Sequence, residues 1–182
     1  MRLLGQKLKD IIGTMKRSLS FILVVLGTLI VFASFGWAYV ENSIGHPAGL
    51  ILPGRLAGLP ITSQMTGPQA VADFSNLHGE QFPLTSGAVG IYGNNQVTLW
   101  VAGAPLNLMA ARLVNAMRDK IAEGNSPFTP IGESLDSNRT IYALEGMGQK
   151  HFYFQSHNLV IWVAANADIA DAALQQLKEI YP

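Results

Sequence analysis

The side chains best suited to chemistry lie close together, where two histidines and four aromatic rings occupy residues 148–166. The stretch reads GQKHFYFQSHNLVIWVAAN. Imidazole nitrogens are common metal ligands, and aromatic rings often line cofactor pockets. A metal site needs more than two ligands, however, and the other histidines, His46 and His78, belong to a Pro/Gly-rich segment and to a predicted helix end. We therefore predict no metal site and no cofactor site in this stretch.

A β-hairpin explains these two histidines better than a metal site does. His157 lies at the predicted turn, and histidine is one of the non-glycine residues enriched at positive φ. His151 and Tyr153 share one face of the preceding strand, and the phenylalanines at 152 and 154 lie on the other face. The aromatic rings are therefore expected to fill the hydrophobic layer between a sheet and its helices.

An internal repeat supports this interpretation. Residues 91–111, IYGNNQVTLWVAGAPLNLMAA, align with residues 153–173, YFQSHNLVIWVAANADIADAA, at a constant offset of 62. Each copy reads as an apolar strand, a polar turn, a strand that contains WVA, and an amphipathic helix, predicted at 106–123 and at 168–180. The sequence thus predicts an α+β fold with two tandem ββα units. We expect a two-layer domain in which an antiparallel sheet carries helices on one face.

Two further elements are predicted outside the repeat. Pro68 suits the first turn of a short helix, which His78-Gly79 would end. A strand is predicted at 139–144, where apolar and polar residues alternate. With these elements, we expect the domain to span residues 68–182.

Motifs for catalysis or nucleotide binding are absent from the sequence. It contains no nucleophile elbow, zinc-protease motif or phosphate-binding loop, and Gly87, Gly90 and Gly93 punctuate a predicted strand instead of preceding a helix. Asp136 and Arg139, with glutamates nearby, are expected to form an ion pair in a solvated loop and not a general acid–base pair. We expect a non-enzymatic protein with no catalytic residues.

Three tyrosines are the candidates for a ligand-binding or partner-binding face. Tyr92, Tyr142 and Tyr153 all fall on predicted strands. A sheet covered by helices on one face would leave the other face open, and these rings could line a groove there. Half-buried strand positions are the simpler explanation. This face supports the alternative function, a membrane-anchored extracytoplasmic sensor or ligand-binding module.

The N-terminal part of the chain predicts a membrane anchor. Residues 18–40 carry no charge, and about 20 apolar residues are enough to cross the hydrocarbon core of a bilayer. Trp37 and Tyr39 lie at the C-terminal end of this span, where amphipathic rings favour the membrane interface. A cleaved signal peptide is the alternative, but its apolar region usually covers only about 7–15 residues.

Charge differs on the two sides of this span. Residues 1–40 carry five basic residues and one acidic residue, whereas residues 41–182 carry seven basic and eleven acidic residues. The basic flank predicts a cytoplasmic N-terminus and an extracytoplasmic C-terminal domain, in the cell membrane, which is the inner membrane if the source is bacterial. The acidic domain argues against nucleic acid as a partner. Because the chain has no cysteine, it can form no disulfide and carry no lipid on a thiol.

Two segments flank the span. Residues 1–17 place apolar and basic residues at helical spacing, which predicts an amphipathic helix on the cytoplasmic lipid surface, or else only a basic tail. Residues 41–67 are rich in proline and glycine, as linkers often are. This linker is unusually apolar, so its side chains are expected to dock on the membrane, on the chain's own domain or on a partner. The apolar residues concerned are Leu50, Ile51, Leu52, Leu56 and Leu59.

These features together predict an accessory or scaffolding subunit of a larger membrane protein complex. Its partners would be the lipid bilayer and membrane protein subunits, reached through the linker and the extracytoplasmic domain. The apolar linker and the lack of catalytic motifs are the observations behind this expectation.

Overall fold

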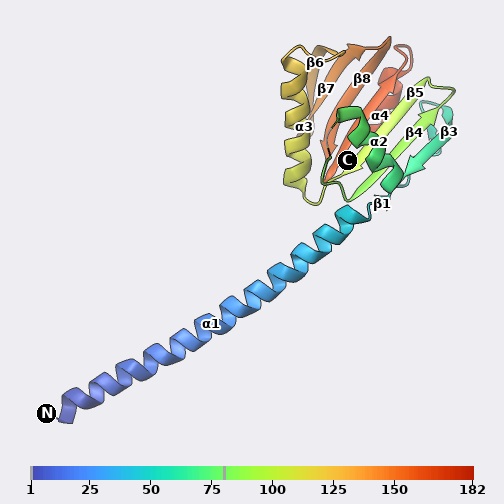
Figure 1. Cartoon of the computed structure of the whole chain (residues 1–182). Coiled ribbons are helices and arrows are strands. Elements are labelled where there is room, and N and C mark those ends of the chain that lie inside the picture. Colours follow the sequence, from blue (N-terminus) through green and yellow to red (C-terminus); the bar gives the residue numbers. More distant parts are fainter. Residues whose placement is uncertain (1, 80) are drawn as a thin grey trace. The chain divides into compact units, whose positions relative to one another are not determined.

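The computed structural model describes residues 2–79 and 81–182, with side chains from residue 19 onward. The chain divides into two compact units, Met1–Glu41 and Asn42–Pro182 (Figure 1). The first unit is helical, and the second is an α+β domain in which helices pack on an antiparallel sheet. The predicted fold class is therefore confirmed at this coarse level.

Helix α1 begins at Arg2 and ends at Gly45, and it makes up the described part of the first unit. Its segment Leu19–Gly45 has a mean hydropathy of 2.4 and is long and apolar enough to cross a membrane. The apolar side chains of this segment are not buried against protein, so the helix fits a transmembrane anchor. A signal sequence near an N-terminus would have the same properties. The amphipathic surface predicted for residues 1–17 depends on side chains outside the described residues.

The second unit is built on a nine-stranded sheet (Figure 1). Eight strands follow the order β2-β3-β4-β5-β9-β8-β7-β6 in antiparallel pairs, and β1 pairs with β4 in parallel. The strands are β1 (Ala48–Gly49), β2 (Arg55–Leu56), β3 (Leu59–Thr66), β4 (Ser86–Tyr92), β5 (Val97–Gly103), β6 (Thr129–Asp136), β7 (Arg139–Gly146), β8 (Gln149–Ser156) and β9 (Leu159–Ala165). The helices of this unit are α2 (Pro68–His78), α3 (Asn107–Ala122) and α4 (Ala170–Ile180).

The two similar hairpins of the sequence, β4–β5 and β8–β9, meet at the centre of the sheet. Strands β5 and β9 pair with each other, and Trp100 lies directly opposite Trp162. Both hairpin turns hold non-glycine residues at positive φ, which is 68° at Asn95 and 52° at His157. The predicted role of His157 as a turn residue is therefore confirmed.

Helices cover both faces of the sheet, which corrects the prediction of a two-layer domain with helices on one face. Helix α3 belongs to the same hydrophobic cluster as Tyr153 and Trp162, whereas α4 packs in the cluster of Phe152 and Phe154. Neighbouring residues of a strand point to opposite faces, so α3 and α4 lie on opposite sides of β8. The domain consequently has three layers, and the helices of the two predicted ββα units do not occupy equivalent positions.

Helix α2 explains this difference between α3 and α4. Ala70 and Phe74 of α2 pack with Val89 and with the half-buried Trp100, on the face that α3 covers further along the sheet. The place over β4 and β5 that α4 would take if it packed as α3 does is therefore occupied by α2. The opposite face of the central strands is also apolar, and α4 buries it by packing Leu177 and its neighbours there.

Residues 48–66, predicted as part of a linker before a domain starting at residue 68, belong to the domain itself. Strand β3 pairs with β4 from Ile61 to Thr66, and β1 extends the same side of β4. The Pro60 carbonyl accepts from the Gly93 N–H at 3.1 Å, so the missing N–H of Pro60 faces the turn that follows β4 and is lost from no β3–β4 ladder bond. The apolar side chains that make this segment unusual for a linker are used in the core, where Leu52 and Leu56 are buried.

Candidate functional site

An open groove lies beside β3. Its volume is about 510 Å³, and its walls are the chain after β1 and the outer part of β3. We call it the β3 groove. It is lined by Gly49, Leu50, Ile51, Leu52, Gly54, Ile61, Gln64 and Thr66. None of these residues is charged, so the groove suits an uncharged ligand surface.

Specific contacts hold the wall of the groove on the domain. Leu52 contacts the position of Gly90, where an added Cβ would lie 2.7 Å from Leu52 Cδ1. The Tyr92 hydroxyl donates a hydrogen bond of 2.9 Å to the carbonyl oxygen of Pro53. The Gln176 amide of α4 accepts from the Ala57 N–H at 2.9 Å and donates to the Arg55 carbonyl at 3.0 Å. Residues 52–57, which include part of the groove wall, are therefore held on the domain at both of their ends.

The five apolar residues predicted for partner docking divide into two kinds. Leu52 and Leu56 are buried in the core of the domain, and Leu50 and Leu59 are partly buried against it. Ile51 is 96% exposed on the rim of the β3 groove. Docking on the chain's own domain, one of the three expected outcomes, accounts for four of the five residues. Ile51 alone is left free for another molecule.

The outer edge of β3 adds unpaired backbone groups to the groove. The Gly67 N–H donates to the Gly87 carbonyl of β4 at 2.8 Å. Backbone groups alternate along a strand, so Met65 also faces β4, whereas Gln64 and Thr66 face away from it. Within the described part of the chain, no backbone group bonds to this outer side of Gln64 and Thr66. The groove therefore offers an apolar wall and a strand edge side by side.

The three tyrosines predicted to share an open face do not share one. Tyr92 is buried on the face that α4 covers, and burial raises the pKa of its hydroxyl above the ordinary value. Tyr142 and Tyr153 lie on the opposite face, beneath α3, with their rings stacked at a centroid distance of 4.7 Å. Burial also raises the pKa of Tyr153, to about 12. The positions are structural, as the simpler interpretation of the sequence proposed.

His151 lies in an aromatic cluster. The Trp162 indole N–H donates to His151 Nδ1 at 3.1 Å, and His151 Nε2–H donates to the Gly146 carbonyl at 3.0 Å. The Phe128 ring packs edge-on against the imidazole at 4.8 Å. Burial lowers the pKa of His151, which favours the neutral ring. Across the described residues, no group of three histidine, aspartate or glutamate side chains could hold a metal ion.

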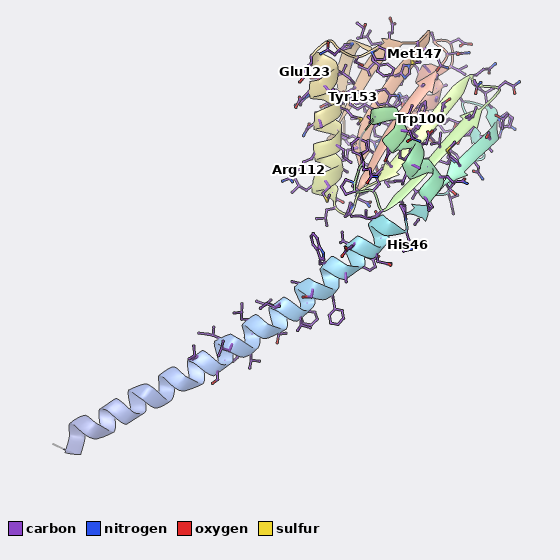
Figure 2. The ribbon with its side chains drawn as sticks, viewed as in Figure 1. His46, Trp100, Arg112, Glu123, Met147 and Tyr153 are labelled. Carbon is purple, nitrogen blue, oxygen red and sulfur yellow. The ribbon has the colours of Figure 1, made fainter. Side chains whose placement is uncertain are left out.

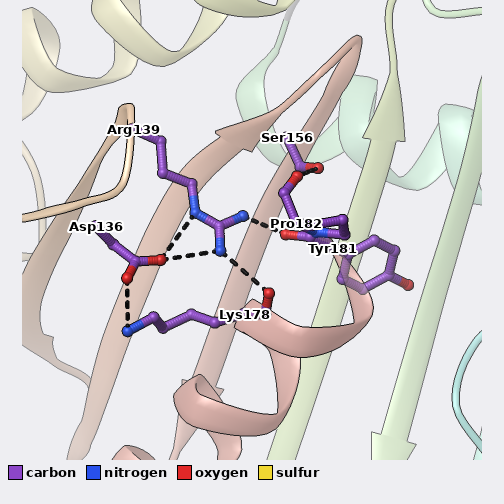
Figure 3. Close-up of polar contacts among 6 residues, drawn as sticks. All are labelled: Asp136, Arg139, Ser156, Lys178, Tyr181 and Pro182. Carbon is purple, nitrogen blue, oxygen red and sulfur yellow. Dashed lines mark hydrogen bonds and ion pairs between the residues drawn. The ribbon is translucent and has the colours of Figure 1, made fainter.

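The predicted ion pair between Asp136 and Arg139 exists, but it is part-buried at the ends of β6 and β7, where it anchors the end of α4, and does not lie in a solvated loop (Figure 3). Lys178 Nζ lies 2.9 Å from Asp136, and its hydrogen bond is the main reason that the pKa of this carboxyl is lowered. The Arg139 guanidinium donates to the backbone carbonyls of Lys178 and Tyr181. Because these groups bond to other parts of the same domain, the cluster stabilises the fold.

Comparison with protein-family models, with curated proteins and with solved structures finds no match. The candidate site is therefore defined by its own geometry. The sequence predictions included the apolar wall of the β3 groove but not Gln64 and Thr66. The two β-branched threonines in TSQMT, residues 62–66, were the available signal for a strand there.

Proposed function

We propose that this protein is a non-enzymatic accessory subunit of a membrane protein assembly. Helix α1 anchors it, with the N-terminus in the cytoplasm and the domain on the extracytoplasmic side. The β3 groove binds an extended segment of a partner subunit. The juxtaposition of the exposed Ile51 with the unpaired edge at Gln64 and Thr66 is the observation that carries this proposal.

Strand addition is the binding mode that suits these features. An extended peptide laid along β3 would form main-chain hydrogen bonds with Gln64 and Thr66, in line with the short strand β2. Its alternate side chains would enter the uncharged groove beside Leu50 and Ile51. Main-chain bonds supply affinity in such complexes, and the side-chain pockets supply specificity.

The groove follows the anchor closely in the chain. Gly49, its first lining residue, comes four residues after the last residue of α1, Gly45. A partner segment that reaches the groove would therefore be near the membrane, as a segment flanking a partner's own span would be. The basic residues before the span favour the proposed orientation.

Site-specific photo-crosslinking in the native membrane tests the proposal. A crosslinking amino acid at position 51 should capture a membrane protein partner, whereas the same group at Leu135, exposed on the far edge strand β6, should not. The Gln64→Pro substitution removes only an outward N–H and places the ring where the added strand would lie, so the crosslink from position 51 should be lost. Gln64→Val keeps the N–H and should keep the crosslink.

Both variants should retain the unfolding temperature of the parent protein, because neither changes the pairing of β3 with β4. Equal crosslinking in Gln64→Pro and Gln64→Val would rule out strand addition. The same products from positions 51 and 135 would show that the groove is not a binding site.

A further inference from the structure

The chain enters the domain from α1 at one end of the sheet. The Ala48 N–H donates to the Thr85 carbonyl, the Thr85 N–H to the Gly103 carbonyl, and the Ala104 N–H to the Asn158 carbonyl, each at 2.8 Å. These bonds connect β1 with the start of β4, the end of β5 and the turn before β9. We call this end of the sheet the connection end.

Two leucines are exposed at the connection end. Leu106 and Leu108 lie two and four residues after Ala104, at the start of α3, and they are 60% and 61% exposed. The Gln155 amide donates to the Asn107 and His157 carbonyls, at 2.9 Å and 2.6 Å, so this turn of α3 is tied to the turn before β9. Both leucines lie outside the hydrophobic clusters of the domain, whose α3 members begin at Met109.

The short connection limits how far this end can lie from the lipid. The apolar helix that could cross the membrane continues to Gly45, and Ala48 is the first residue of the sheet. Three residues of extended chain span at most about 10 Å. The headgroup layer on each side of a bilayer is itself about 5–7 Å thick. The connection end is therefore held within reach of the membrane surface whenever α1 spans it.

We propose that the connection end rests on the bilayer, with Leu106 and Leu108 inserted at the boundary between headgroups and acyl chains. The occupant of this surface is lipid. The proposal rests on the anchoring role of α1 in the proposed function. Arg112, exposed one helical turn after Leu108, is positioned to meet lipid phosphate, as basic residues at membrane surfaces do. The contact would hold the β3 groove close to the membrane for a partner segment.

Site-directed fluorescence on the full chain tests this contact, because the protein has no cysteine and a single introduced thiol can be labelled cleanly. The probe is an environment-sensitive dye, and the quencher is a phosphatidylcholine with a spin label on its acyl chain, in phosphatidylcholine vesicles that contain anionic lipid. Leu108→Cys reports on the proposed contact. Met147→Cys is the matched control, since Met147 is 79% exposed in the β7–β8 turn at the opposite end of the sheet. Figure 2 shows Met147 and Arg112 toward opposite ends of the domain.

We expect the dye at position 108 to emit at shorter wavelength and to be quenched several-fold more than the dye at position 147. One strand length, about 25 Å, separates the two ends, which exceeds the reach of a lipid-borne quencher. A third variant, Leu26→Cys, reports on the span itself and should be quenched most.

Each other outcome contradicts the proposal in a distinguishable way. Strong quenching at position 26 with equal, weak quenching at positions 108 and 147 would overturn the lipid contact and leave the anchor intact. A blue-shifted but unquenched dye at position 108 would mean that protein covers the leucines, and it would also overturn the contact. An unquenched dye at position 26 would remove the anchor, and both proposals would fail together.

Discussion

His151 shows how a residue that resembles a catalytic or metal-binding group can have a structural role. Its two nitrogens are both used, one as an acceptor from Trp162 and the other as a donor to Gly146. Its ring packs against Phe128 and Trp162 under α3. Sequence spacing placed His151 on a strand, but the hydrogen bond from the Trp162 indole depends on a partner eleven residues away on the neighbouring strand.

The buried imidazole predicts a dependence of stability on pH. Because the folded-state pKa of His151 lies below its ordinary value of 6.5, the unfolded chain binds a proton at a higher pH than the folded chain does. Stability should therefore be full above about pH 7 and should fall as the pH drops through 6.5, by at most about 1.4 kcal/mol per pH unit.

Urea unfolding of the detergent-solubilised protein at pH 7.5 and pH 5.5 measures this effect. His151→Phe keeps a ring in the cluster but does not titrate, so its loss of stability between the two pH values should be smaller than that of the parent. An equal loss in both proteins would show that His151 is not the group responsible.

At the scale of elements, the hairpin of β2 and β3 depends on one side chain of α4. Gln176 bonds to the backbone of both Arg55 and Ala57, and no comparable contact is made by its exposed neighbour Gln175. Ala57, at the turn, has a φ of 50°, a conformation that most non-glycine residues avoid. These two hydrogen bonds, which we call the Gln176 clamp, therefore offset the strain at Ala57 in the turn that holds the groove wall.

Removal of this clamp should loosen the hairpin without unfolding the domain. Two hydrogen bonds contribute about 1 kcal/mol each, so in Gln176→Ala the hairpin should open at least about tenfold more often. Trypsin cleavage after the exposed Arg55 measures the opening, and the rate should rise by that factor. Gln175→Ala is the control and should be cleaved at the parent rate. A parent-like rate in Gln176→Ala would mean that the clamp contributes nothing.

The whole molecule divides after residue 41, well before the boundary that the sequence suggested at residue 68. Residues 48–66 supply three strands, and their removal would uncover β4 along the side now paired with β3. It would also expose the core around Tyr92, which Leu52 and Leu56 now help to cover.

This boundary predicts different behaviour for two truncated chains. Residues 42–182 should fold alone and unfold cooperatively. Residues 68–182 lose the burial of two leucines, about 2 kcal/mol each, together with the pairing of a central strand, out of a total stability of about 5–15 kcal/mol. The shorter chain should therefore be unfolded or aggregated. Circular dichroism melting and size-exclusion chromatography compare them, and the same melting temperature in both would contradict the boundary.

Local patterns in the sequence were sufficient for the elements themselves. The apolar run, the helix after Pro68, the hairpins on either side of residues 95 and 157, and the amphipathic helices all form where predicted, within a few residues. These features depend on side-chain periodicity and on turn residues, which act between residues close together in the sequence.

Which face each element buries was not available from such patterns. Apolar residues occupy both faces of β8 and β9, so periodicity could not show that α3 and α4 would lie on opposite sides. That choice depended on α2 having already filled one position, and the β3 groove depended on residues 50–54 crossing over Gly90. Segments that are far apart in the sequence compete to pack on the same surface. Which of them covers it is decided only when the whole domain packs together.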